Sequence, residues 1–454
     1  MEKKFIKLRK FLLILLCILA FFTIFKIFKG KSFFDTIVEY QNDIYSENSP
    51  IESLDYKSYF AKYEEHIPVK YDEIAKVNSN EYIVKNKENI YKYNTKEEKE
   101  DHITTLIDKN KDVFEIIAND KWLIWGESET WENEEKIFYK WDIFFKDLNK
   151  ESTDIKKIDS GEFNRFKSEQ RNFNSLIPDS FCIENDKFLY RKIIRSEHKN
   201  NNIISDLVTS ELVLYDLNSN KLSTIYGLGD VSIELISNPK ISDNIIAFEK
   251  RTLPDGKGIF KRTEIYTYNI LNGEVKKIIE SKNVISFDLN KKNLIVLSGN
   301  SDLSIYICNL KDNKKINLLY KGSKAEKYIC DKNELSEIYS IEFVDDNNII
   351  INYRPIENKL GILVYNLSNK RFYSLEEDIN DYIEDNKYDN PLINVNVFQD
   401  EIRIQIGNYI KKITENKNEN IVTFLPVNNE EINPTMDNLD NNIIYYKYLI
   451  YKLK

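Results

Sequence analysis

The 454-residue sequence is poor in residues that commonly carry chemistry. Its three histidines, His66, His102 and His198, stand far from one another and from cysteine, so they offer no metal-ligand spacing. It contains no glycine-rich phosphate loop and no G-x-S-x-G nucleophile motif. A Ser-His-Asp hydrolase needs a histidine held between a nucleophile and an acid, and isolated histidines do not indicate that arrangement. We therefore expect no catalytic residue, no cofactor site and no metal site.

Cysteine and glycine are also scarce. The four cysteines (Cys17, Cys182, Cys308 and Cys330) form no CxxC pair, and only three follow the N-terminal segment, so a disulfide framework is not indicated. Glycine contributes only 12 residues, whereas there are 29 tyrosines and 25 phenylalanines. Aromatic and β-branched residues favour strands, so this composition indicates a β-rich protein.

One long apolar run stands near the N-terminus. Phe11–Phe25 holds no charge, and Ile27 and Phe28 extend it past Lys26. Eighteen helical residues span about 27 Å, close to the roughly 30 Å hydrocarbon core of a bilayer. Basic residues are more numerous before the run than after it, which predicts a cytoplasmic N-terminus. We expect a cytoplasmic tail (1–10), a transmembrane signal anchor (11–28), a membrane-proximal segment (29–78) and a domain outside the cell membrane (79–454).

Two alternatives to a retained anchor remain open. A cleaved signal peptide would end at a small-x-small site, for which Gly30-Lys31-Ser32 is a weak candidate. A lipid anchor on Cys17 would need a small residue where Leu16 stands.

Beyond residue 31 the chain is strongly acidic, with 57 basic and 73 acidic residues. Nucleic-acid binding needs Lys and Arg to neutralise phosphates, and anionic lipid also attracts basic surfaces. We therefore expect no nucleic-acid partner, contact with the membrane through the N-terminal helix only, and a protein or cell-envelope partner for the domain.

A strand-and-turn unit recurs along this domain. An apolar strand followed by a polar turn begins at Asp142, Glu211, Glu264, Ser304 and Gly361. In each unit a Leu or Ile stands before the turn, namely Leu148, Leu217, Ile270, Leu310 and Leu367. A second apolar run precedes each unit: Trp122–Trp125, Phe188–Tyr190, Ile245–Phe248, Leu294–Leu297 and Ile349–Ile351. Hairpins also fit Tyr82–Tyr93, Ile402–Ile413 around a Gly407-Asn408 turn, and Ile443–Leu453.

Paired strands at a period of about 40–55 residues are typical of a β-propeller. The second strands are continuously apolar, as expected when neighbouring blades cover both faces of a sheet. We predict an all-β propeller over residues 79–454 with six to eight blades, seven if the terminal strands share one blade. A β-sandwich or two tandem β domains are the alternatives, and a short helix is expected within Asp55–Ala75.

Two stretches carry a family resemblance. ISDNIIAFEKR (Ile241–Arg251) and ELVLYDLNSNK, which begins at Glu211, resemble the blades of bacterial TolB-like (WD-type) β-propeller proteins. The resemblance implies the propeller fold. The chain departs from the family in usually lacking Pro-Asp-Gly in its blade turns and in lacking the separate N-terminal α/β domain. A TolB-like role is therefore not implied.

Two further patterns bear on binding. Acidic residues crowd between Glu376 and Asp389 and again at Asp437 and Asp440, but without calcium-loop spacing, so we interpret both as solvated loops. All four tryptophans lie within twenty residues. Trp122, Trp125 and Trp141 sit in apolar runs and are expected in the core. Trp131 lies in the polar stretch ESETWENEEK, which predicts either an exposed partner contact on a loop or an aromatic folded back on the domain.

The absence of catalytic patterns favours a membrane-anchored, non-enzymatic binding or scaffolding module outside the cell membrane. The alternative is a propeller hydrolase or lyase that acts on cell-wall or extracellular glycans with two axial carboxylates. A sensor that acts through the single helix is a third hypothesis.

The predicted anchor is open to a direct test. Intact mass and N-terminal sequencing of membrane-extracted protein should find the first residues retained, because no good cleavage site follows the apolar run. A mature start near Phe33 would contradict the anchor. Protease added to intact protoplasts should digest the large domain, and protection of that domain would contradict the orientation.

Overall fold

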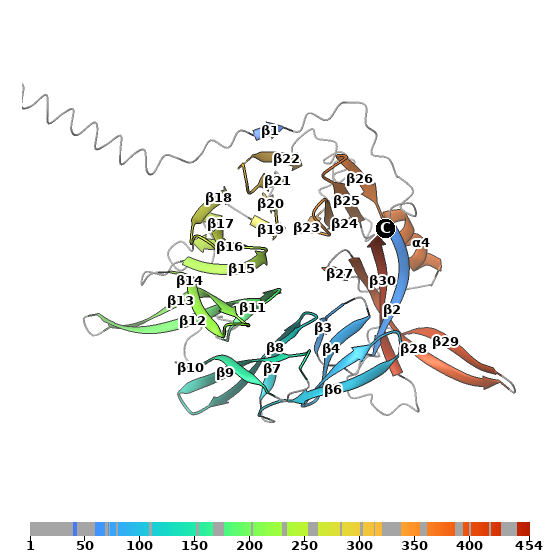
Figure 1. Ribbon diagram of the computed structural model, residues 1–454, viewed down its shortest axis with the longest axis horizontal. Helices are drawn as coiled ribbons and strands as arrows, with labels where there is room; N and C mark the ends of the chain where they lie inside the picture. The colour runs from blue at the N-terminus through green and yellow to red at the C-terminus, as the bar shows by residue number, and fades with distance from the viewer. Residues whose placement is uncertain are drawn as a thin grey trace, which may run out of the picture.

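The computed structural model describes residues 40–42 and 60–454, apart from internal stretches of which the longest include 167–176, 253–261, 320–336, 386–393 and 428–442. The described strands form seven sheets arranged as blades around a common axis (Figure 1). The predicted all-β propeller, with seven blades, is confirmed.

Six blades are contiguous in sequence, and each is an antiparallel sheet whose strands follow chain order from the axis outward (Figure 1). They comprise blade 1, β3 (Glu73–Lys76), β4 (Glu81–Asn86), β5 (Asn89–Asn94) and β6 (Lys99–Thr105); blade 2, β7 (Asp112–Ala118), β8 (Trp122–Glu132), β9 (Lys136–Asp147) and β10 (Lys156–Phe166); blade 3, β11 (Asp179–Glu184), β12 (Lys187–Asn200), β13 (Ile203–Asp216) and β14 (Lys221–Gly227); blade 4, β15 (Glu234–Ser242), β16 (Ile245–Thr252), β17 (Arg262–Asn269) and β18 (Val275–Ser281); blade 5, β19 (Val284–Leu289), β20 (Asn293–Ser298), β21 (Ser304–Asn309) and β22 (Lys315–Leu319); and blade 6, β23 (Glu337–Phe343), β24 (Asn348–Arg354), β25 (Gly361–Asn366) and β26 (Arg371–Ser374).

The recurring sequence unit corresponds to the second and third strands of blades 2 to 6. The same backbone geometry recurs at the Leu or Ile before each turn. Its N–H donates to a carbonyl in the turn before the second strand, at 2.7–2.9 Å in all five blades: Leu148 to Lys121, Leu217 to Asp186, Ile270 to Asn244, Leu310 to Lys292 and Leu367 to Asn347. The repeated residue therefore closes the end of the hydrogen-bond ladder between the second and third strands.

Turns between first and second strands are built by Asn and Asp side chains. Asn119 Oδ1 accepts hydrogen bonds from the N–H groups of Lys121 and Trp122, at 3.0 and 2.8 Å. Asn78, Asn290 and Asp345 make the same pair of contacts in blades 1, 5 and 6. Such side chains hold a tight turn without glycine, which explains how a glycine-poor chain forms so many hairpins.

Apolar clusters fill the spaces between neighbouring blades. Seven clusters lie among the described residues, one at each blade-to-blade interface. At the interface of blades 1 and 2, for example, Ile83 packs in the same cluster as Leu123 and Trp125, and all three are fully buried. Because each blade buries its faces only against its neighbours, the stability of one blade depends on the next.

Blade 7 joins the two ends of the described chain. It contains β27 (Asn394–Phe398), β28 (Glu401–Asn416), β30 (Ile443–Leu453) and, as its outermost strand, β2 (Phe60–Pro68). Strand β2 pairs antiparallel with β30 from Phe60 opposite Leu453 to Pro68 opposite Tyr445. Segment 29–78 therefore contributes β2 and β3 to the ring, and the helix expected within Asp55–Ala75 is replaced by these strands over its described residues.

Three further elements decorate the ring. Strand β28 continues past the blade and pairs with β29 (Glu419–Val427), and this arm projects outward as the β12–β13 hairpin does (Figure 1). The turn expected at Gly407-Asn408 is wrong, because β28 runs through both residues with an irregularity between Gln405 and Gly407. The acidic run expected as a loop forms helix α4 (Glu376–Asp385), whose Ile379 is buried between blades 6 and 7. Strand β1 (Tyr40–Asn42) pairs with the outer edge of β22.

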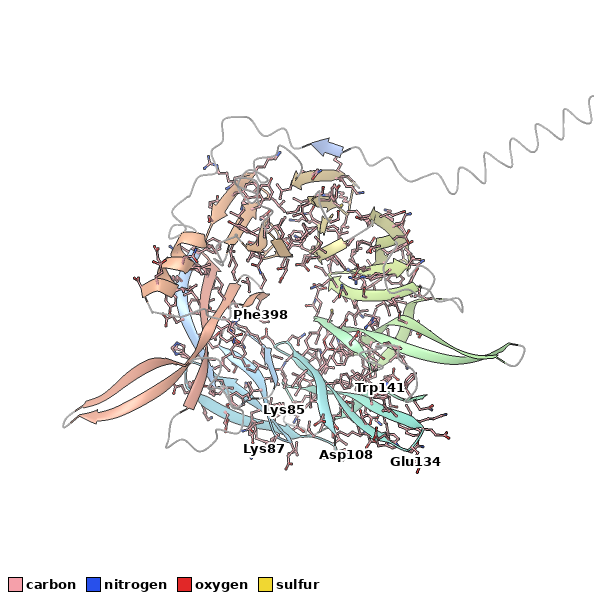
Figure 2. All side chains as sticks on the ribbon, turned by 180° about the vertical axis from the view of Figure 1, so that it is seen from behind. Lys85, Lys87, Asp108, Glu134, Trp141 and Phe398 are labelled. Carbon is pink, nitrogen blue, oxygen red and sulfur yellow. The ribbon has the colours of Figure 1, made fainter. Side chains whose placement is uncertain are left out.

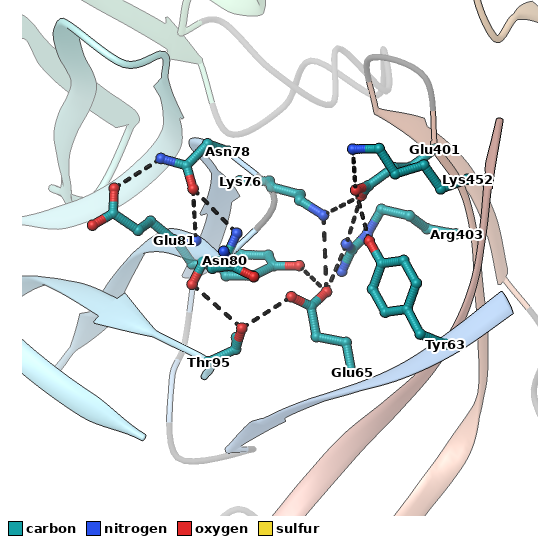
Figure 3. A network of polar contacts seen from close by, with 11 residues as sticks. Tyr63, Glu65, Lys76, Asn78, Asn80, Glu81, Thr95, Glu401, Arg403 and Lys452 are labelled. Atoms are coloured by element: carbon teal, nitrogen blue, oxygen red, sulfur yellow. Dashed lines mark hydrogen bonds and ion pairs between the residues drawn. The ribbon is translucent and has the colours of Figure 1, made fainter. Parts of the chain in front are cut away.

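A buried polar network joins blades 7 and 1 (Figure 3). The apolar cluster at this seam contains only five buried residues, three of them tyrosines. Arg403 on β28 lies 2.6 Å from Glu65 on β2, and Lys76 on β3 donates to Glu401 on β28 at 2.5 Å. Tyr82 also donates to Glu65. The four charged side chains are almost fully buried, so buried ion pairs supplement the small apolar cluster at this seam.

The pKa values of these groups reflect the burial. Burial alone raises the pKa of Glu401, but hydrogen bonds from Lys76 and Tyr63 outweigh it and bring the pKa below its usual value. Burial, together with the nearby Arg403, lowers the pKa of Lys76. The carboxylate of Glu401 is therefore stabilised at neutral pH only while its cationic partners remain in place.

No helix in the described part of the chain is long and apolar enough to cross a membrane. The predicted span, residues 11–28, lies outside the described residues.

Removing one partner of the seam network should destabilise the ring strongly. Arg403→Leu removes the guanidinium that pairs with the buried carboxylate of Glu65. Such a change costs about 3–5 kcal/mol. Lys452→Met is the matched control: Lys452 lies 3.5 Å from Glu401 but is 36% exposed, so its loss should cost at most about 1 kcal/mol. Urea unfolding measures both. Equal losses for the two variants would show that the buried network does not hold the seam.

Candidate functional site

The first strand of every blade borders the axis of the ring. Phe398, at the end of β27, lies beside the centre of the ring (Figure 2). First strands of successive blades contact each other from β3 to β23. Each first strand lies at the end of its sheet, so one edge has no strand paired to it within the described ranges. The axis is thus bordered by strand edges whose backbone N–H and C=O groups are not all taken up by strand pairing.

Charge is segregated between the inner and outer strands. The seven first strands carry nine acidic residues and two basic ones: Glu73, Asp112, Glu115, Asp179, Glu184, Glu234, Asp288, Glu337 and Glu342 against Lys76 and Lys240. The seven outermost strands carry ten basic and seven acidic residues. The excess of acidic over basic residues is therefore concentrated on the strands that border the axis.

Polar side chains bridge consecutive first strands. Glu115 on β7 accepts a hydrogen bond from the N–H of Phe181 on β11 at 2.8 Å. Cys182 on β11 donates its thiol to the carbonyl of Pro239 on β15, with Sγ and O 3.0 Å apart. Burial raises the pKa of Cys182 to about 12, so this thiol stays protonated and acts as a donor and not as a nucleophile.

The same belt continues through Lys240, Asp288 and Glu342 on β15, β19 and β23. Lys240 Nζ lies 3.8 Å from Asp288 Oδ1, and Asp288 Oδ2 accepts a hydrogen bond from the N–H of Phe343 at 2.8 Å. Glu342 accepts a backbone hydrogen bond from Val397 on β27. Three successive blades thus place a lysine and two carboxyl groups beside the axis.

The surroundings make these carboxyl groups hard to ionise. Burial raises the pKa of Asp288, and burial together with the nearby charge of Asp288 raises the pKa of Glu342. Burial alone lowers the pKa of Lys240, but attraction to Asp288 outweighs it and raises that pKa. Titratable groups held away from their ordinary pKa values in one cluster are typical of functional sites, so we take this axial trio (Lys240, Asp288 and Glu342) as the candidate site.

Linear sequence gave no reason to select the axial trio. The recurring unit covers second and third strands, whereas the trio lies on first strands, about fifty residues apart along the chain. One usable signal exists: each of the three precedes the apolar second strand of its blade by five to seven residues.

The tryptophans expected in the core are buried, and the tryptophan expected as a contact residue is exposed. Trp122, Trp125 and Trp141 are 4%, 0% and 3% exposed, so their core assignment is confirmed. Trp131 is 41% exposed, but the loop interpretation is wrong, because it lies in strand β8. There its ring stacks on Phe138 of β9 in blade 2, whereas the axial trio lies on blades 4, 5 and 6.

Two of the three histidines have described side chains. His102 Nε2 lies 3.3 Å from Thr105 Oγ1, and His66 Nε2 lies 3.7 Å from Glu64. The side chain of His198 lies outside the described residues.

Comparison with known proteins relates the fold to solved propellers. No family model matches the chain, and no curated protein matches it. Among solved structures it is similar to prolyl endopeptidases (TM-score 0.49, 9% identity, 82% of this chain and 51% of theirs). It is also similar to the Pyrococcus horikoshii acylaminoacyl peptidase (0.42, 12%, 77% and 51%) and to an uncharacterized protein of Listeria monocytogenes (0.41, 13%, 75% and 93%). The chain spans about half the length of the peptidases it matches.

These neighbours correct the expected function. The non-enzymatic scaffold and its glycan-cleaving alternative are contradicted, because the solved structures with a similar propeller include prolyl endopeptidases and an acylaminoacyl peptidase. At such low sequence identity, the likeness to these structures shows a shared fold alone.

The raised pKa of Asp288 predicts a specific pH dependence of stability. A carboxyl whose pKa is higher in the folded state is most favourable when protonated, so folding stability falls as pH rises from about 4 through the raised pKa. Asp288→Asn keeps an acceptor for the Phe343 N–H but does not titrate, so its unfolding free energy should fall less over this range. Urea unfolding at several pH values measures the slope. The exposed control Asp312→Asn should keep the wild-type slope. If Asp288→Asn kept that slope as well, the raised pKa of Asp288 would be contradicted.

Proposed function

We propose that the propeller binds an extended segment of polypeptide at its axis, as the substrate-handling part of a peptidase. The hydrolytic groups would come from outside the described residues, either from elsewhere in the protein or from a partner chain. The observation that carries the proposal is the ring of first strands, each with one edge that no described strand pairs with, around an acidic axis.

An extended peptide needs backbone partners, and the first strands offer them. Strand edges bind polypeptides through main-chain hydrogen bonds, which depend little on the peptide's sequence. That property suits a protein that handles varied peptides.

The charge of the axis adds selectivity. Nine acidic and two basic residues on the first strands favour peptides that carry lysine, arginine or a free amino terminus. Of the two basic residues, Lys76 is already held by Glu401. Lys240 keeps 44% of its side-chain surface exposed, so it can meet a peptide carboxylate beside the surrounding acids.

We further propose that the apolar run 11–28 holds the propeller at the cell membrane, with the propeller on the outer side. Support comes from the length of the run and from the basic residues before it. A peptide-handling ring at this position would meet polypeptides outside the cell.

Photocross-linking tests where a peptide binds. An extended Lys-Gly peptide with a central benzoylphenylalanine should, on irradiation, label β15, β19 and β23. The double variant Asp288→Asn/Glu342→Gln should lower the yield several-fold, because it replaces two axial carboxyl groups with neutral amides. The matched control Glu274→Gln/Asp312→Asn removes two charges from exposed outer turns and should cross-link as wild type does. Labels confined to outermost strands, or equal yields in both double variants, would contradict axial binding.

A further inference from the structure

The hairpin of β8 and β9 carries a stacked aromatic pair at its outer end, of which Trp131 is exposed and Phe138 half-buried. Trp131 and Phe138 are direct cross-strand partners, and their rings stack with centroids 5.4 Å apart and planes 6° from parallel. Trp131 is 41% exposed, in contrast to the three buried tryptophans of the chain. We call this pair the Trp131 platform.

The platform is held by a three-stranded sheet. Strand β10 pairs with β9 as far as Phe166 opposite Lys136, so it supports the hairpin up to its end. On the opposite face Tyr139 packs against Phe163, with ring centroids 6.2 Å apart. A stacked pair on such a sheet keeps its orientation without a partner, so a ligand that lies on it loses little conformational freedom.

The surroundings of the platform are acidic. Between residues 129 and 140 stand Glu129, Glu132, Glu134 and Glu135 against Lys136 and Lys140, and both lysines lie on the face of the sheet that carries Phe138. Glu134 lies at the outer end of the hairpin, away from the ring (Figure 2). Glu129 precedes Trp131 by two residues on β8, which puts both on one face of the strand, about 6.6 Å apart. Its contact with Lys140 is long, at 3.7 Å, and Lys140 is 48% exposed, so this pairing is weak.

An exposed indole beside a carboxylate selects a particular side chain. Arginine is planar and weakly hydrated, so its guanidinium can lie flat on a tryptophan while its N–H groups reach an acid. Lysine can use the charge but not the stacking. We infer that the Trp131 platform docks a basic, extended segment of another polypeptide, with an arginine stacked on Trp131 and paired with Glu129. This inference is independent of the proposed axial binding, since the two sites lie on different parts of the propeller and use different residues.

Binding of short labelled peptides tests the inference. Fluorescence anisotropy of a fluorescein-labelled (Arg-Gly)5 peptide should show tighter binding than (Lys-Gly)5 and none for (Glu-Gly)5. Trp131→Ala should weaken binding of the arginine peptide about thirtyfold, as expected for an aromatic hot spot. Glu129→Gln should weaken it as well. Glu274→Gln, an equal change of charge on a turn of blade 4, should leave the affinity unchanged.

A stability control keeps the result interpretable. Trp131→Ala should hardly change the melting temperature, whereas Trp125→Ala should lower it clearly, because Trp125 is fully buried and donates to Glu127 at 2.8 Å. Comparable losses of stability would make Trp131 a packing residue and overturn the inference. Wild-type affinity in Trp131→Ala would also overturn it. So would equal weakening by Glu129→Gln and Glu274→Gln, since that would indicate diffuse attraction by an acidic protein.

Discussion

The ring depends on one pairing, that of β2 with β30 in blade 7. Every blade buries its faces only against its neighbours, so an open ring would expose apolar surface on both end blades. The chain prevents this by placing its first ring strand beside its last. The seam this creates has few apolar residues, and Glu65, Lys76, Glu401 and Arg403 take their place. The closing strand and the ion pairs act together, because Glu65 lies on β2 itself.

Sequence predicted the parts of the fold that repeat. The second strands are continuous apolar runs because both their faces are covered, and the Leu or Ile after each third strand makes the same hydrogen bond in five blades. Strands β2 and β3 were missed because polar residues interrupt them: FAKYEEHIP carries the acid that completes the seam. The turn at Gly407-Asn408 failed for another reason, since pairing with β30 on one side and β29 on the other keeps β28 extended.

The candidate site lies where sequence gave least guidance. Lys240, Asp288 and Glu342 come from three blades and meet only because first strands surround one axis. Trp131 was recognised from its polar neighbours, but its stacking on Phe138 follows from the strand register alone. The inner wall and the outer hairpin thus present two acidic surfaces of different kinds, one lined by backbone edges and one by an aromatic pair. We propose that both bind basic polypeptide segments.

Closure of the ring by β2 is the claim on which the rest depends, and hydrogen exchange on the intact protein tests it most directly. If β2 is an integral strand of blade 7, its amides should exchange as slowly as those of β30 and of the buried strands β16 and β20, because all open only with the ring. Exchange of β2 at the rate of a solvent-exposed segment, while β16 and β20 stay protected, would contradict closure by this strand.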